Sequence, residues 1–269
     1  MIIGGKNFDT KHHTYVMGIV NATPDSFYKG SRHNTPEETL RKVLMMQEEG
    51  ADLIDLGAES TRPGHIPVTA QEEMERLLPA LELIRQNTDI PISVDTTKAE
   101  VAREAIRLGC NLINTIHGLL DPEMAACIAY AGVPCCLMHN RSDSRYTDFQ
   151  AEFQQDMNDI LKRAEDFGIS RDRIILDPGI GFAKNYEQNL CVLNHLKDWR
   201  IPDVPWLLGT SRKSVIGNAL SLPAEERLEG TLATTVLAVM SGYSFVRVHD
   251  VKENKRCILM TEAIRCCGK

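Results

Sequence analysis

The sequence predicts a (β/α)₈ barrel, in which eight parallel strands alternate with helices. Its 269 residues are close to the usual length of one such barrel. Eight short apolar runs recur along the chain, each ends in polar residues, and a helical pattern follows each of them. An open, doubly wound parallel sheet is the less favoured alternative. No linker-like or low-complexity segment divides the chain, so we expect residues 1–269 to form a single domain.

The predicted strands are apolar almost throughout, as expected of strands that are covered on both faces in a parallel sheet. The first is Tyr15–Val20, which stops at Asn21 before a loop that contains proline. The other seven are Leu53–Leu56, Ile92–Val94, Leu112–Ile116, Pro134–Met138, Ile174–Leu176, Trp206–Leu208 and Phe245–Val248.

Start and stop signals for helices lie between these strands. In three capping boxes a threonine N-cap should pair with a glutamate three residues later: Thr35 with Glu38, Thr69 with Glu72, and Thr97 with Glu100. Pro36 would occupy the first helical position of the earliest of these helices. Glycines stand where helices should end, at Gly50, Gly109, Gly132, Gly168 and Gly242. The caps and stops therefore alternate with the strands in the order that a barrel requires.

Composition excludes several classes of function. A net charge of -7 argues against general affinity for nucleic acid, and no apolar run approaches membrane-spanning length. The first residues lack the apolar core of a secretory signal, so we expect a cytoplasmic protein with no membrane partner. The eight cysteines match no zinc or redox spacing. His117 and His139 follow predicted strands but form no recognisable metal site, so we assign no zinc.

Polar residues that follow the strands should meet at one rim of the barrel. Asp95, Asn114, Asp177 and Lys213 would bring two carboxylates, an amide and an ammonium to its mouth. A flat heterocycle with a donor edge and an acceptor edge suits this set, because each buried polar atom of a ligand needs a partner. A single Asp at a strand end would more simply be a helix cap. Four such groups together favour a binding site.

A second group of rim residues is suited to anions. Arg62, Arg212, Arg247 and His249 belong to it, and arginines bind phosphate oxygens bidentately. The helix expected to open after Ser211 would add free backbone amides. Surface arginines usually pair with acidic neighbours, but the apolar run around Arg247 is too strand-like for a solvated side chain. Asn21 could bind a metal ion or make a polar contact.

Six motifs, in this order, resemble those of the dihydropteroate synthase family over essentially the whole chain. They are Asn21–Phe27, Gly57–Gly64, Val94–Thr96, Asp177–Phe182, Ser211–Ser214 and Arg247–Asp250. The resemblance implies a (β/α)₈ barrel, usually dimeric, that joins 6-hydroxymethyl-7,8-dihydropterin diphosphate to 4-aminobenzoate. The products would be 7,8-dihydropteroate, for folate synthesis, and diphosphate.

The same resemblance implies roles for individual residues. Asp95, Asn114, Asp177 and Lys213 would hold the pterin, and Met138 and Phe182 would pack against the bound rings. Asn21, Arg62, Arg247 and His249 would hold diphosphate and its Mg²⁺, with Asn21 as the metal ligand. Thr61, Pro63 and Ser214 would shape the aminobenzoate site. Asp95, Asp177, Lys213 and Arg247 are the expected catalytic residues.

The sequence departs from the family pattern in its loops. Lys29 and Thr115 stand where acidic residues are usual, and Ala183 stands where glycine is common. We expect Lys29 to point to solvent rather than to contact departing diphosphate. Two other functions stay open: a pterin-dependent methyltransferase, which would need no diphosphate site, and a relative that binds pterin without turnover.

Overall fold

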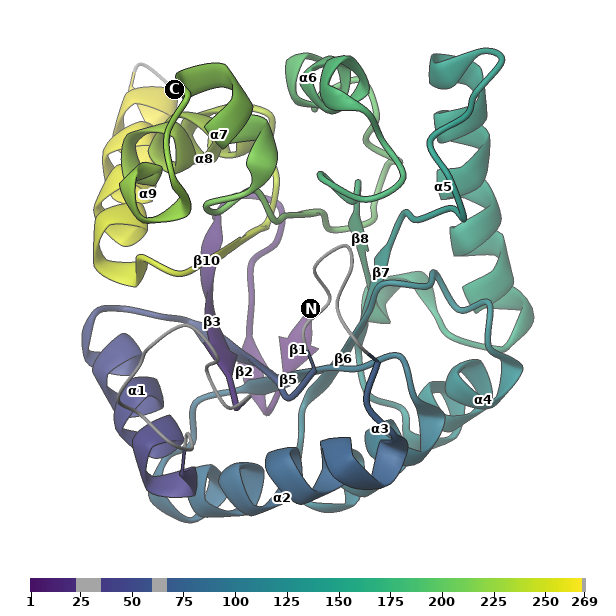
Figure 1. Ribbon diagram of the computed structural model, residues 1–269, viewed down its shortest axis with the longest axis vertical. Coiled ribbons are helices and arrows are strands. Elements are labelled where there is room, and N and C mark those ends of the chain that lie inside the picture. The colour runs from purple at the N-terminus through teal and green to yellow at the C-terminus, as the bar shows by residue number, and fades with distance from the viewer. Residues whose placement is uncertain (23–34, 60–66, 268–269) are drawn as a thin grey trace.

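The computed structural model describes residues 1–22, 35–59 and 67–267, and it shows a barrel of parallel strands inside a ring of helices (Figure 1). Each predicted strand is present to within a residue at its ends: β3 (Tyr15–Asn21), β4 (Leu53–Gly57), β5 (Ile92–Asp95), β6 (Leu112–Thr115), β7 (Cys135–Met138), β8 (Ile174–Asp177), β9 (Leu207–Leu208) and β10 (Phe245–Val248). Their hydrogen-bonded order is β8-β7-β6-β5-β4-β3-β10-β9. A parallel bridge between Leu176 and Trp206 joins the two outer strands and closes the barrel.

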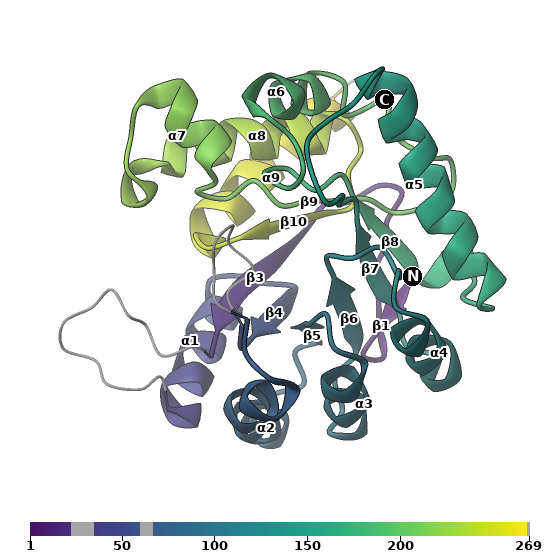
Figure 2. The same ribbon diagram turned by 45° about the vertical axis from the view of Figure 1, so that its right-hand side comes forward.

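Helices follow the strands in the predicted alternation. They are α1 (Pro36–Glu48), α2 (Ala70–Asn87), α3 (Ala99–Arg107), α4 (Pro122–Ala131), α5 (Phe149–Asp166), α6 (Tyr186–Asn194), α7 (Ser214–Leu220), α8 (Leu228–Met240) and α9 (Val251–Cys266). In Figure 2 the strands run between α1 to α4 on one side and α6 to α9 on the other. Within the described residues, no helix combines the length and the apolar character that crossing a membrane requires.

Two of the three predicted capping boxes are confirmed, at Thr35 with Glu38 and at Thr69 with Glu72. The third prediction, at Thr97, is wrong. Helix α3 begins one residue later, with Lys98 as an N-cap that makes no side-chain cap hydrogen bond. The backbone N–H of Lys98 donates to Thr96 Oγ1 at 3.2 Å, and this local turn delays the helix.

The predicted helix stops are confirmed. Each of the five glycines has a positive φ at the helix C-cap or directly after it: Gly50, Gly109, Gly132, Gly168 and Gly242. Left-handed backbone of this kind ends a helix at least cost when the residue has no side chain.

The barrel interior is apolar toward the amino-terminal ends of its strands. Most strands contribute one side chain to this layer, which contains Met17, Leu53, Leu112, Cys136, Ile175, Leu207 and Phe245. An N-terminal hairpin of β1 (Ile2–Ile3) and β2 (Lys6–Asn7), which the sequence did not predict, adds Ile3 and Phe8 to it. Both side chains are buried, so the hairpin closes this end of the barrel. Any site inside the barrel must therefore open at the other end.

Candidate active site

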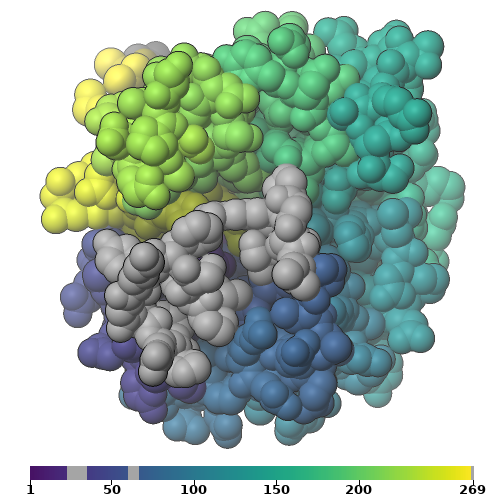
Figure 3. Space-filling model, viewed as in Figure 1, coloured from purple at the N-terminus to yellow at the C-terminus, as the bar shows by residue number. Residues whose placement is uncertain are grey.

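Polar side chains replace apolar ones further along the same strands. Side chains alternate along a strand, so a residue two positions after an inward-facing one also faces inward. By this rule Leu53 is followed by Asp55, Leu112 by Asn114, Ile175 by Asp177 and Phe245 by Arg247. The space-filling view in Figure 3 shows the face at which these strands end, with the segments around α6 and α7 over its upper half.

Asp55 lies at the centre of the polar layer, and the sequence analysis missed it. Its fully buried carboxylate accepts hydrogen bonds from Ser93 Oγ at 2.6 Å, Asn114 Nδ2 at 3.0 Å and Arg247 Nε at 2.5 Å. A signal was present, because an Asp inside the apolar run Leu-Ile-Asp-Leu-Gly must find partners if the strand is buried. The same argument predicts the burial of Arg247 in its own apolar run.

Arg247 is mostly shielded from solvent, in line with the prediction, with 19% of its side chain exposed. Its Nη2 donates to Asp95 Oδ2 at 2.8 Å, so one guanidinium joins Asp55 to Asp95. Burial opposes its charge, but the two carboxylates raise its pKa above the ordinary value. The arginine therefore fixes the position of both acids.

Asp95 has one oxygen that the described residues leave without a hydrogen-bond partner. Oδ2 is bound by Arg247, whereas Oδ1 is buried and unpaired. Burial, with a contribution from Asp55, raises the pKa of Asp95 to about 7, and Arg247 opposes the shift. Once Asp95 is ionised, above about pH 7, this oxygen is a buried acceptor without a partner, which costs about 1–3 kcal/mol, so it is suited to a donor from a ligand.

The raised pKa of Asp95 predicts an effect of pH on stability. Folded Asp95 keeps its proton up to about pH 7, whereas the unfolded residue loses it near 3.8. Between these values the folded state binds more protons, so the contribution of this group to the free energy of unfolding falls as pH rises. We compare the free energy of unfolding in urea of Asp95→Asn with that of wild type. The difference, variant minus wild type, should therefore be more positive at about pH 8 than at about pH 5. An equal difference at both pH values would contradict the shift.

Asp177 and Lys213 are two further charged groups at the mouth, next to the loop between β8 and α6, and each influences the charge of the other. Asp177 Oδ1 accepts from the backbone N–H of Gly179 at 2.8 Å. Lys213 Nζ donates to the carbonyl of Ile180 at 2.6 Å and lies 4.9 Å from the ring centroid of Phe182. Burial raises the pKa of Asp177 and lowers that of Lys213 to about 8, and each charge opposes the shift of the other.

Three other predicted residues lie at or directly after strand ends or at a helix start. Met138 is buried at the end of β7, while Ser214 is exposed as the first residue of α7. His249 Nδ1 lies 3.0 Å from Ser211 Oγ, and burial beside Arg212 and Arg247 lowers its pKa to about 3. His249 is therefore neutral at physiological pH.

Other predicted residues have different contacts from those expected or lie outside the described part of the chain. Arg212, expected to face an anion, pairs with Asp250, with Nε 3.0 Å from Oδ2. Thr115 is buried at the end of β6. Thr61, Arg62 and Pro63 lie outside the described residues, as does Lys29.

Asn21 ends β3 with an exposed side chain at the same rim. Among the described residues, no three His, Cys, Asp or Glu side chains are placed to hold a metal ion together. Mg²⁺ is usually bound by one or two protein oxygen ligands, most often carboxylates, with phosphates of the substrate and water completing its shell. One amide oxygen at the rim fits that mode of binding.

Comparison with known proteins agrees with this geometry. The family model for pterin binding enzymes matches residues 17–249. The chain is 49% identical over 266 residues to dihydropteroate synthase of Clostridium beijerinckii, covering 98% of this chain and 99% of the relative. It is 46% identical over 255 residues to the Bacillus subtilis enzyme of the same name, covering 94% and 90% of the two chains.

Solved structures give the same result. A dihydropteroate synthase from Clostridium difficile, crystallised in the presence of pteroic acid, superposes with a TM-score of 0.92 at 45% identity and covers 96% of this chain and 99% of its own. The Xanthomonas albilineans enzyme with 4-aminobenzoic acid gives a TM-score of 0.90 at 39% identity and covers 94% of each chain. With sequence, fold and polar barrel mouth in agreement, the chain belongs to the dihydropteroate synthase family of pterin binding enzymes.

Proposed function

We propose that this protein joins 6-hydroxymethyl-7,8-dihydropterin diphosphate to 4-aminobenzoate and releases 7,8-dihydropteroate and diphosphate. The observation that carries the proposal is the pair of charged sites at the barrel mouth. Asp95 offers a buried, unpaired oxygen, and Asp177 lies with Lys213 beside an aromatic ring. The pterin and aminobenzoate compounds bound by the relatives are the ligands that such a site would take.

The pterin suits the acids and the lysine. The N–H groups of its ring and amino group would donate to Asp95 and Asp177, while Lys213 and the amide of Asn114 would meet its acceptors. Phe182 and Met138 would cover the ring. We assign the same four polar residues to pterin binding that the sequence predicted, and we add Asp55 as the residue that positions Arg247 and Asn114.

The reaction needs no nucleophilic side chain. The C–O bond between the pterin methylene and diphosphate breaks, diphosphate leaves with the electron pair, and a bond forms from the aminobenzoate nitrogen to that carbon. The nitrogen then loses a proton. Because the methylene is attached to an electron-rich ring, departure can precede attack, so the protein need only stabilise separated charge and hold the amine in place.

The diphosphate would lie toward Arg247 and His249, and the family resemblance adds Arg62 to this site. The resemblance also assigns the aminobenzoate site, to Thr61, Pro63 and Ser214. Arg247 and His249 are two residues apart at the end of β10. Mg²⁺, held by Asn21, would neutralise charge on the departing diphosphate. Magnesium dependence and cytoplasmic localisation stay predictions.

Turnover with both substrates tests the proposal. Purified protein mixed with the pterin diphosphate, 4-aminobenzoate and Mg²⁺ should form dihydropteroate and diphosphate in equal amounts. A chelator should abolish this formation, and added Mg²⁺ should restore it. Pterin binding without product would indicate a relative that binds without turnover, and the synthase proposal would be wrong.

We also propose that the protein is a homodimer that pairs through α8 and α9, which lie side by side in Figure 1. Apolar side chains on these helices are between 46% and 62% exposed: Leu237, Met240, Leu259, Met260 and Ile264. Clustered exposed apolar groups mark contact surfaces. A second copy would bury them by pairing the same faces.

Light scattering should give about twice the chain mass of 30.1 kDa. Met240→Glu should shift the protein toward the monomer because it would bury a charge in the interface. Leu190→Glu, at an exposed position of α6, is the matched control and should stay dimeric. A monomeric wild type at micromolar concentration would overturn the proposal.

A further inference from the structure

Lys184 is a buried lysine that the chemistry above does not use. It lies between β8 and α6 and is 9% exposed. Its ammonium donates to the carbonyls of Gly179 at 3.2 Å and Phe182 at 3.1 Å, and to His139 Nδ1 at 2.8 Å. Burial lowers the pKa of Lys184 to about 7, and in the charged form the three hydrogens of the ammonium match these three acceptors. The lysine is therefore fully occupied in holding protein groups.

Both backbone groups that Lys184 holds belong to residues that contact the proposed pterin site. Gly179 donates its N–H to Asp177 Oδ1, and the ring of Phe182 faces Lys213. Between them, the carbonyl of Ile180 accepts from Lys213. The loop from Gly179 to Ala183 is thus held by Lys213 through the carbonyl of Ile180 and by Lys184 through the carbonyls of Gly179 and Phe182.

This loop needs such support because its backbone conformation is costly. The φ angles of Gly179, Gly181 and Ala183 are 68°, 84° and 44°. An alanine in the left-handed region costs on the order of 1 kcal/mol and persists only where surrounding contacts enforce it. A Cβ atom at Gly179 would lie 2.0 Å from the carbonyl oxygen of His139, so the loop is packed directly against the end of β7.

Lys184 is itself held by a chain of hydrogen bonds that reaches the surface. His139 is fully buried, and its Nε2 lies 2.8 Å from Asp156 Oδ2. Burial lowers the pKa of His139 to about 4, so the imidazole is neutral at physiological pH. Because its Nδ1 accepts from Lys184, the single proton belongs on Nε2. Asp156 is bound in turn by Arg141 Nε at 2.6 Å and Nη2 at 3.0 Å.

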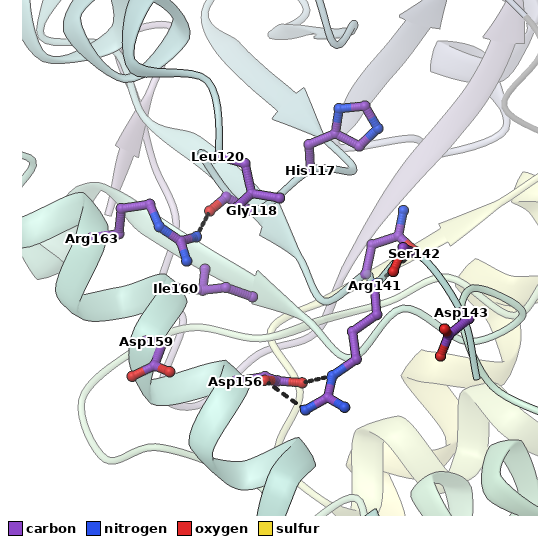
Figure 4. A pocket seen from close by; sticks show the side chains of 11 residues that line it. His117, Gly118, Leu120, Arg141, Ser142, Asp143, Asp156, Asp159, Ile160 and Arg163 are labelled. Atoms are coloured by element: carbon purple, nitrogen blue, oxygen red, sulfur yellow. Dashed lines mark hydrogen bonds and ion pairs between the residues drawn. The ribbon is translucent and has the colours of Figure 1, made fainter. Parts of the chain in front are cut away.

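Figure 4 shows Arg141 and Asp156 directed toward each other in the wall of an outer cavity of about 330 Å³. Segments after β6 and β7 and the helix α5 line this cavity. The chain Arg141–Asp156–His139–Lys184 therefore runs from this cavity to the β8–α6 loop.

We propose that Lys184 is a positioning residue for pterin binding, which holds the β8–α6 loop so that Gly179 orients Asp177 and Phe182 covers Lys213. The inference rests on the proposed function, since it assumes that Asp177 and Lys213 bind pterin. It predicts that Lys184 acts on the pterin and leaves aminobenzoate binding unchanged.

The test compares Lys184→Met, which keeps the length of the side chain without its donors, with wild type. Calorimetry with 6-hydroxymethylpterin should show at least about fivefold weaker binding, which corresponds to the net contribution of about one ordinary hydrogen bond. The KM for 4-aminobenzoate at saturating pterin diphosphate should stay within about twofold. Lys162→Met is the matched control, because Lys162 is an exposed lysine of α5 that pairs with Asp166, and it should bind pterin as wild type does.

A double-mutant cycle with Phe182→Ala separates positioning from general destabilisation. If Lys184 acts through Phe182, Lys184→Met should weaken pterin binding less in the Phe182→Ala background than in wild type. A merely structural role would reduce affinity by the same factor in both backgrounds. Equal factors would overturn the part of the proposal that runs through Phe182, and unchanged pterin affinity in folded Lys184→Met would overturn all of it.

If Lys184→Met does not fold, Asp156→Asn gives the same test through His139. Asp156→Asn should also weaken pterin binding, by a smaller factor than is expected for Lys184→Met. Unchanged affinity would count against the proposal. Wild-type protein serves as the positive control throughout. If wild type itself failed to bind pterin, the proposed function would be wrong, a result distinct from failure of the Lys184 variants alone.

Discussion

Replacing Asp177 with alanine should weaken binding of 6-hydroxymethylpterin at least tenfold, as measured by calorimetry. The Asp177 side chain is buried beside Lys213, and a ligand donor left without its acceptor costs about 1–3 kcal/mol, more where charge is involved. The fold should survive, because Asp177 is at the open end of the barrel rather than in its apolar layer.

Asp172→Ala is the matched control for that variant. Asp172 is an exposed aspartate in the turn Arg171–Arg173, directly before β8, so its removal should leave pterin affinity unchanged. Circular dichroism should show the same spectrum for both variants. If Asp177→Ala bound pterin as tightly as wild type, the assignment of the pterin to this pair of charges would be wrong.

Arg247→Met should lower the free energy of unfolding by about 3–5 kcal/mol, as measured in urea at about pH 8. The substitution removes the cation that two carboxylates share and leaves Asp55 and Asp95 buried without it. Removing one partner of a buried ion pair is costly for this reason. Pterin binding should be lost in parallel, because Asp95 would no longer be held in place.

A second substitution tests whether unpaired buried charge causes the loss of stability in Arg247→Met. Adding Asp55→Asn to Arg247→Met should recover part of the lost stability, since the neutral amide no longer needs a cation. Arg145→Met, which removes an exposed arginine paired with Asp143, should leave the unfolding midpoint nearly unchanged. A midpoint for Arg247→Met close to that of wild type would contradict a buried ion network in the barrel.

The strands and most helix ends were predictable because their signals are local. Apolar runs mark the strands, and a threonine with a glutamate three residues later marks a helix start. The prediction at Thr97 failed because a turn at Thr96 intervened, and Lys98 is also drawn toward Glu59 and Glu73, which are distant in sequence. The N-terminal hairpin was missed because Ile3 is stabilised only by contacts with the finished barrel.

The polar rim was predictable for a similar reason, since each strand end carries its own polar residue. The pairing of these residues across the barrel was not predictable from the sequence. Arg247 was expected to be buried, but its partners Asp55 and Asp95 lie 192 and 152 residues away along the chain. Lys184 gave no local signal, because only the fold brings His139 and the carbonyls of the β8–α6 loop together around its ammonium.

The central claim is that the carboxyl ends of the strands form the pterin site, and a crystal structure of the complex with 6-hydroxymethylpterin tests it most directly. We predict that the ring lies in the barrel mouth, with a donor on the unpaired oxygen of Asp95, a second donor on Asp177, and Phe182 against the ring. A pterin bound in the outer cavity beside Arg141, or one at the mouth that leaves both carboxylates untouched, would contradict the account.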